Sequence, residues 1–121
     1  MSTVVEKQTE AVVNHHLKAI LAKDIDGVME DYTEDSVFIV YSDPEAMHGL
    51  AAIRAMFTQH LEAIAPEVLS SFKVHRLTVD GEIAYLVWSL GKEIPFASDT
   101  FVVRGGKIVA QTAVAYVPQG G

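Results

Sequence analysis

One hairpin decides the fold of this chain: Ala97-Ser98-Asp99-Thr100-Phe101-Val102-Val103, the turn Arg104-Gly105-Gly106-Lys107, then Ile108-Val109-Ala110-Gln111-Thr112-Ala113. Both arms are rich in apolar and β-branched residues, which favours strands, and the glycine pair favours a tight turn between them. One carboxylate, Asp99, lies within the first arm. An ionised carboxylate is costly in apolar surroundings unless it is paired or protonated. Asp99 is therefore either an acid held at a site or a strand-end residue that reaches water.

The chain before this hairpin predicts helices first and strands afterwards. Apolar residues recur at helical spacing over 5–20, which predicts a first helix of about twenty residues. Asp24 is the expected N-cap of a short second helix, and residues 37–41 are expected to form a strand. A third helix is expected over 50–65.

Further strands follow the third helix. Residues 72–79 and 83–90 are expected to form a hairpin around the tight turn Asp80-Gly81, and the quoted hairpin comes next. The sequence therefore predicts one α+β domain over 1–121, with three N-terminal helices packed on a strongly curved antiparallel β-sheet.

The last two predicted strands are apolar on both faces. Asp99 and Phe101 alternate with Thr100 and Val102, so neither face is clearly polar. Antiparallel sheets that face water alternate apolar and polar residues. Because three helices cover only one face, we expect a homodimer through the outer face of the sheet.

Composition excludes several classes of function. The chain has 121 residues, a formal net charge of −7, nine scattered Lys and Arg residues and no cysteine. Nucleic-acid binding needs clustered cations, and zinc–thiolate or disulfide chemistry needs cysteine. The start of the sequence has no signal-peptide pattern, and no apolar run is long enough to cross a membrane. A cytoplasmic protein without nucleic-acid or membrane partners is expected.

Four motifs carry a resemblance to a known family. They are Lys23-Asp24-Ile25-Asp26-Gly27-Val28, Asp35-Ser36-Val37-Phe38, His48-Gly49-Leu50-Ala51-Ala52-Ile53-Arg54 and Asp99-Thr100-Phe101-Val102-Val103-Arg104-Gly105-Gly106-Lys107-Ile108. In this order they resemble the nuclear-transport-factor-2-like superfamily, in its SnoaL-like and ketosteroid-isomerase-like branch. The resemblance covers about Thr9 to Val117. It implies a cystatin-like cone around an apolar pocket, and frequent dimers.

The resemblance to ketosteroid isomerase transfers only in part. Asp99 aligns with the protonated aspartate of the isomerase oxyanion hole, a carboxylic acid kept neutral by its apolar site. His16 aligns with the tyrosine that completes the oxyanion hole, and Val40 aligns with the catalytic base. Valine has no proton chemistry, so the sequence predicts that this chain is not a true ketosteroid isomerase. SnoaL-type polyketide cyclases also use a pocket aspartate.

Asp99 and His16 are the candidate catalytic residues. Asp99 is an acid that Gln111 on the neighbouring strand orients, or the two form a buried polar pair that only fixes strand register. His16 lies on the apolar stripe of the first helix, where it is a second donor, a base near Asp99, or a core histidine with one backbone partner. His15 points about 100° away and is expected to be exposed, unable to share a ligand with His16. The acidic run around Asp31 is expected to be a solvated helix end.

The candidate substrate-binding residues are Gln111, the predicted pocket-wall aromatics and one residue of the third helix. The full set is Gln111, Phe57, His60, Phe101, Trp88 and Val40. Packing is an alternative role for each of them. No metal site and no cofactor are expected, because the five histidines include no His-x-His or His-x-x-x-His pair.

Two functions remain open from the sequence. In the first, a cofactor-independent isomerase, cyclase or lyase acts on a small apolar carbonyl compound, with Asp99 donating to its oxygen and His16 accepting a proton. In the second, the chain is a non-catalytic ligand-binding or dimerisation module. The second function predicts that the polar groups of the pocket pair with one another.

Overall fold

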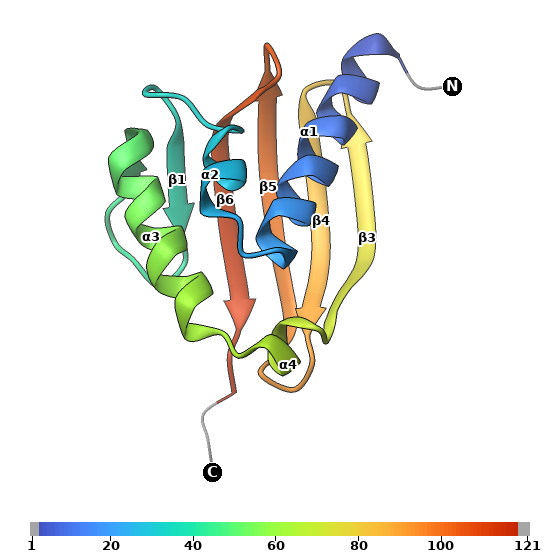
Figure 1. Ribbon diagram of the computed structural model, residues 1–121. Coiled ribbons are helices and arrows are strands. Elements are labelled where there is room, and N and C mark those ends of the chain that lie inside the picture. The colour runs from blue at the N-terminus through green and yellow to red at the C-terminus, as the bar shows by residue number, and fades with distance from the viewer. Residues whose placement is uncertain (1–2, 119–121) are drawn as a thin grey trace.

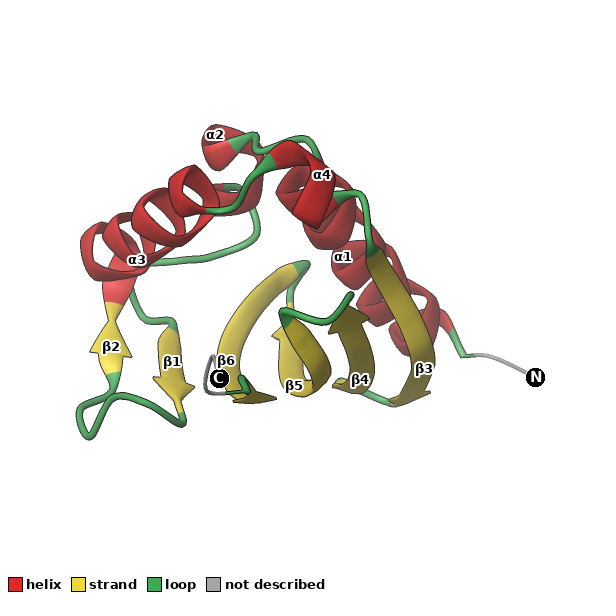
Figure 2. Ribbon diagram, turned by 90° about the horizontal axis from the view of Figure 1, so that it is seen from below, coloured by secondary structure: helices red, strands yellow, loops and turns green. Residues whose placement is uncertain are grey.

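In the computed structural model, which describes residues 3–118, helices lie over one face of a six-stranded sheet (Figures 1 and 2). The helices are α1 (Val4–Leu21), α2 (Ile25–Met29), α3 (Gly49–Ala63) and α4 (Pro66–Leu69). The strands are β1 (Val37–Val40), β2 (Met47–His48), β3 (Phe72–Asp80), β4 (Ile83–Leu90), β5 (Ile94–Arg104) and β6 (Lys107–Tyr116). The predicted α+β class and the predicted order of the main elements are confirmed.

The first two helices begin where the sequence predicts. Thr3 caps α1 in a reciprocal capping box with Glu6. Asp24 caps α2, and its side chain accepts a hydrogen bond from the backbone N–H of Gly27 at 3.0 Å. A Cβ atom at position 27 would lie 2.5 Å from the Asp24 carboxylate, so glycine leaves room for the cap. These caps fix the start of each helix.

Two short elements were not expected. Helix α4 is a single turn that begins with Pro66 at its first position and buries Leu69, and β2 is a two-residue strand. Within residues 3–118 the sheet is therefore covered by four helices rather than three. Both elements are too short to produce a periodic apolar pattern in the sequence.

The sheet order is β2-β1-β6-β5-β4-β3, and one of its pairs is parallel. Strands β3 to β6 form the predicted antiparallel meander, but β1 runs parallel to β6, with Val37 opposite Ala110 (Figure 1). The expectation of a wholly antiparallel sheet is therefore wrong at β1. Just before this strand, Ser36 Oγ donates to the carbonyl of Ile108 at 2.6 Å. This bond joins the start of β1 to the start of β6, in agreement with their parallel pairing.

The core fills the space between the helices and the concave face of the sheet. Its most buried apolar side chains come from both layers: Val13, Val28, Ile53, Leu86, Phe101 and Ile108. Each such side chain contributes about 1.5–3 kcal/mol by leaving water. Along β5, Ala97, Asp99, Phe101 and Val103 are all buried, which confirms the predicted inward face of the hairpin.

The opposite face of the sheet carries exposed apolar side chains. The helices leave this face uncovered (Figure 2). Ile83 and Tyr85 on β4, Phe96 on β5, and Val114 and Tyr116 on β6 are all exposed, and Phe96 lies opposite Tyr116 in the strand register. Within residues 3–118, no helix combines the length and apolar character needed to cross a membrane.

Candidate functional site

A cavity of about 360 Å³ lies between α1, α3 and the concave face of the sheet. Its wall is mostly apolar and includes Leu17, Ile20, Met56, Leu86 and Leu90. The volume is within the range of small-molecule sites in proteins. All eight candidate residues from the sequence lie on this one wall: His16, Val40, Phe57, His60, Trp88, Asp99, Phe101 and Gln111.

Asp99 is the centre of a hydrogen-bond network in this wall. Its side chain is buried, and the residue is 8% exposed. Trp88 Nε1 donates to Asp99 Oδ1 at 2.8 Å, and Gln111 Nε2 donates to Asp99 Oδ2 at 2.8 Å. The hydroxyl of Tyr32 donates to Gln111 Oε1, which fixes the orientation of the amide. The Asp99–Gln111 contact that the sequence allowed is therefore present, and Trp88 and Tyr32 extend it.

Burial and hydrogen bonding act on Asp99 in opposite directions. Burial raises the pKa of the Asp99 carboxyl, while the hydrogen bonds from Trp88 and Gln111 act to lower it; the burial effect is the larger. Burial also raises the pKa of Tyr32 well above its ordinary value, so this phenol stays neutral and remains a donor. Trp88 and Gln111 both donate to Asp99, so the proton of the protonated carboxyl remains available to donate to a ligand in the cavity that Asp99 lines.

His16 sits in an aromatic cage on the same wall. Its ring centroid lies 5.5 Å from that of Phe101 and 5.7 Å from those of Tyr32 and Phe57, all in edge-on arrangements. Within residues 3–118 His16 makes no side-chain hydrogen bond, and its Nδ1 is a buried nitrogen without a partner. Burial lowers the pKa of His16 to about 3, so the imidazole is neutral near pH 7.

This geometry bears on the roles left open for His16. The side chain is fully buried, as a core histidine would be, but the backbone partner expected for that role is absent within residues 3–118. The two candidate catalytic residues are also not joined, because no hydrogen bond connects His16 to Asp99 in that part of the chain. His16 and Asp99 are therefore separate polar groups on one apolar wall.

Asp31 is the residue that the sequence analysis misplaced. It was expected to be solvated, yet it is 5% exposed and lies under α1, where His15 Nδ1 contacts its two carboxylate oxygens at 2.9 and 3.0 Å. His16 Nδ1 lies 3.8 Å from Asp31 Oδ2. His15 is exposed, as expected, and within residues 3–118 it alone of the two histidines is hydrogen-bonded to Asp31. Their side chains diverge on the helix, but Asp31 lies between them.

Other contacts of two candidate residues, His60 and Trp88, are with the backbone and with an aromatic ring. His60 is exposed at the cavity rim, where its Nδ1 lies 2.8 Å from the carbonyl of Met56. The indole of Trp88 packs against Phe72, with the ring centroids 5.6 Å apart. Trp88 lines the cavity and therefore lies on the concave face of the sheet. Within residues 3–118 no three acidic, histidine or cysteine side chains are arranged to hold a metal ion.

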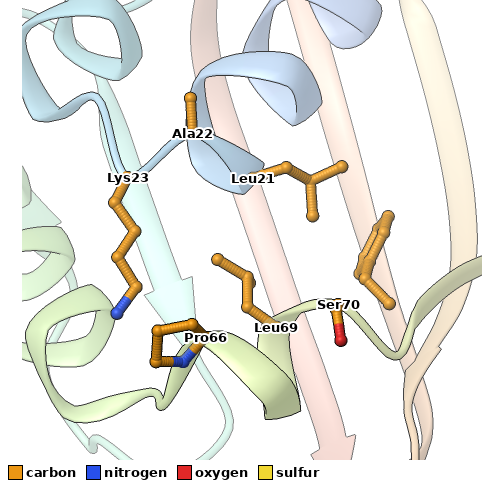
Figure 3. Close-up of a pocket in the computed structure, with 7 residues that line it drawn as sticks. Leu21, Ala22, Lys23, Pro66, Leu69 and Ser70 are labelled. Atoms are coloured by element: carbon orange, nitrogen blue, oxygen red, sulfur yellow. The ribbon is translucent and has the colours of Figure 1, made fainter.

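A second hollow lies outside the cavity, between the end of α1 and α4 (Figure 3). It has a volume of about 420 Å³ and is lined by Leu21, Ala22, Lys23, Pro66, Leu69, Ser70 and Phe72. Its one ammonium group, on Lys23, already donates to the carbonyl of Ile64. Leu69 and Phe72 line both spaces and so separate the hollow from the cavity.

The family of the chain follows from its sequence match. A model of the SnoaL-like domain matches residues 13–111, and the chain therefore belongs to the SnoaL-like family. The resemblance inferred from the four motifs is confirmed. Among curated proteins none matches this sequence.

Solved structures share the fold at low sequence identity. An NTF-2-like protein of unknown function from Burkholderia xenovorans is 21% identical, with a TM-score of 0.79 over 98% of this chain and 91% of that one. A protein from Kribbella flavida assigned as a ketosteroid isomerase is 19% identical, with a TM-score of 0.67 over 96% and 85%. A protein from Shewanella denitrificans assigned as a SnoaL-like polyketide cyclase is 13% identical, with a TM-score of 0.71 over 89% and 90%. At these identities the likeness shows the fold alone.

The first prediction concerns the protonation of Asp99. In a carbon-detected NMR titration, with Asp99→Asn to assign the signal, the carboxyl pKa should lie above its ordinary value of 3.8. Trp88→Phe should raise this pKa further, because it removes a donor that favours the carboxylate. Phe72→Leu, which removes the ring packed on Trp88 but no donor, is the control. A pKa at or below the ordinary value would contradict the prediction.

The second prediction concerns His16 and the stability of the fold. A histidine whose pKa is lowered on folding costs stability as the pH falls below 6.5, because the unfolded chain then binds a proton that the folded chain does not. Between pH 7.5 and 5.5, the wild type should lose about 1.4 kcal/mol of unfolding free energy relative to His16→Leu. Urea unfolding at both pH values measures this difference. Phe57→Leu changes the same cage but keeps His16, so its unfolding free energy should depend on pH as the wild type's does. A difference in unfolding free energy between wild type and His16→Leu that does not change with pH would refute the prediction.

Proposed function

We propose that this protein is a cofactor-independent enzyme of the isomerase, cyclase or lyase type that acts on a small, largely apolar carbonyl compound. One observation carries the proposal: within residues 3–118, Asp99 is the only carboxyl group in the cavity wall, and a network of three side chains holds it there. A buried acid in an apolar cavity favours a functional site. The names of two similar proteins, a ketosteroid isomerase and a polyketide cyclase, agree with a carbonyl substrate.

The proposed reaction passes through an enol. The protonated Asp99 carboxyl donates to the carbonyl oxygen of the ligand, while neutral His16 takes a proton from the adjacent carbon. The electron pair of that C–H bond forms the new C=C bond, and the oxygen gains the proton from Asp99. The imidazolium of His16 then gives its proton to a different carbon, the enol oxygen returns its proton to Asp99, and the C=O bond re-forms, which completes an isomerisation and restores both side chains. Val40, where ketosteroid isomerase has its base, supports a reaction other than steroid isomerisation.

A second candidate function is ligand binding without catalysis. The observation that favours it is the pairing within the network, where each Asp99 oxygen and both ends of the Gln111 amide already have a partner. A network of this kind would shape one end of an apolar cavity without chemistry. His16 argues for the enzyme, because within residues 3–118 its Nδ1 has no such partner.

The test uses a carbonyl probe and its enol analogue. In D₂O, the wild type should exchange the α-hydrogens of 2-tetralone. Asp99→Asn should exchange them at least about 10²-fold more slowly, which is the rate loss expected when an acid–base group is removed. Calorimetric binding of 2-naphthol should change less than threefold, because asparagine can still donate to its oxygen. Asp43→Asn, the same change at an exposed aspartate, should behave as wild type.

Two outcomes would overturn this proposal. Equal exchange by the wild type and Asp99→Asn would exclude Asp99 as the acid. Binding of 2-naphthol with no exchange of 2-tetralone by the wild type would support the ligand-binding function instead.

We also propose that the protein pairs with a second copy through the outer face of the sheet. The support is the row of exposed apolar side chains on β4, β5 and β6, which soluble monomers rarely leave uncovered. Sedimentation equilibrium should give twice the chain mass of 13.2 kDa. Tyr85→Glu on this face should give monomers, whereas Val4→Glu, at an exposed valine of α1, should not. A monomeric wild type would refute the dimer.

The cytoplasmic location stays a prediction.

A further inference from the structure

The buried carboxylate of Asp31 lies between two adjacent histidines of α1. The backbone of Asp31 is fixed, because its carbonyl accepts a hydrogen bond from the N–H of Ile108 at 2.6 Å. The side chain lies beside His15 and His16 of α1, and the residue is 5% exposed. A buried carboxylate is stable only with partners. The two imidazoles beside it are the partners that this position offers.

His15 holds the carboxylate from the solvent side. Its Nδ1 contacts both Asp31 oxygens, and its Nε2 lies 3.5 Å from Glu30 Oε2. The imidazole side chain is 45% exposed. Burial raises the pKa of Asp31, whereas His15 and the charge of Lys107 act to lower it. His15 therefore both orients the carboxylate and favours its ionised form.

His16 faces the same carboxylate from the cavity side. Its Nδ1 is buried, has no hydrogen-bond partner in the described part of the chain, and lies 3.8 Å from Asp31 Oδ2. This separation is not a hydrogen bond but brings the two groups within ion-pair distance. Such contacts are often long in ligand-free proteins and shorten when the ligand binds. His16 is also one of the residues that line the cavity.

We propose that Asp31 is a positioning residue for His16, and that His15 holds it in place. The Asp31 carboxylate keeps the imidazole proton of His16 on Nδ1, so that Nε2 presents its lone pair to the cavity. When Nε2 takes a proton from a carbon of the ligand, the imidazolium carries a proton on each nitrogen, and Asp31 compensates its charge. The inference rests on the proposed function and names the group that makes His16 a base there.

The first test reads the tautomer of His16 in the ligand-free protein. Two-bond ¹H–¹⁵N NMR at pH 7.5 should show the proton on Nδ1 in the wild type and on Nε2 in Asp31→Leu, which has no acceptor. Asp31→Glu should restore the Nδ1–H form. His15→Gln, a change at a half-exposed position, should give a mixture of the two forms. Glu30→Gln is the matched control, since it alters the neighbouring carboxylate, which lies 3.5 Å from His15 Nε2, and should leave the tautomer of His16 unchanged.

The second test measures the rate of hydrogen exchange. Asp31→Leu should exchange the α-hydrogens of 2-tetralone at least about tenfold more slowly than wild type. Its affinity for 2-naphthol should change less than threefold, because Asp31 lies outside the cavity wall.

The outcomes separate this inference from the proposed function. A wild-type His16 with its proton on Nε2, or an Nδ1–H form that persists in Asp31→Leu, would overturn the role of Asp31. Equal exchange by wild type and Asp31→Leu would overturn it while leaving the proposed function intact. A tautomer that depends on Asp31, in a wild type that exchanges no α-hydrogen, would support the positioning of His16 and refute the proposed function.

Discussion

The backbone of Ile108, near the start of β6, is hydrogen-bonded to the segment between α2 and β1. Its N–H donates to the carbonyl of Asp31, and its carbonyl accepts from Ser36 Oγ, both at 2.6 Å. Through these bonds the segment between α2 and β1 is attached to the first residues of β6. The attachment agrees with the parallel pairing of β1 and β6, and it holds Tyr32 close enough to reach Gln111 further along β6. The site therefore depends on a contact between residues far apart in the sequence.

The polar groups of the hydrogen-bond network come from one loop segment and from three strands of the sheet. Tyr32 comes from the segment after α2, while Gln111, Asp99 and Trp88 come from three adjacent strands. In a low-dielectric interior such bonds are strong, and an unpaired member is costly. The network is complete without a ligand, whereas His16 has no partner in the described residues. The cavity thus combines an acid that already accepts two hydrogen bonds with an imidazole whose Nδ1 accepts or donates none within residues 3–118.

The sequence predicted what depends on local pattern. Alternation along 97–113 was enough to place Asp99 and Gln111 on the buried face of adjacent strands, and helical spacing was enough to bury His16. Asp31 could not be predicted, because its burial follows from the bond to Ile108 and from the way α1 crosses above it. The pairing of Trp88 with Asp99 also escaped, since the strand parity of the indole was ambiguous. Residues bound by distant contacts carry no local signal.

Trp88 gives the molecule a spectroscopic property. It is the only tryptophan of the 121 residues, and its indole N–H is bonded to Asp99 while its ring faces the cavity. Indole emission depends on the hydrogen bond at Nε1 and on nearby charge. The tryptophan fluorescence of this protein therefore reports on one place only, the surroundings of the Asp99 carboxyl group, with no label attached.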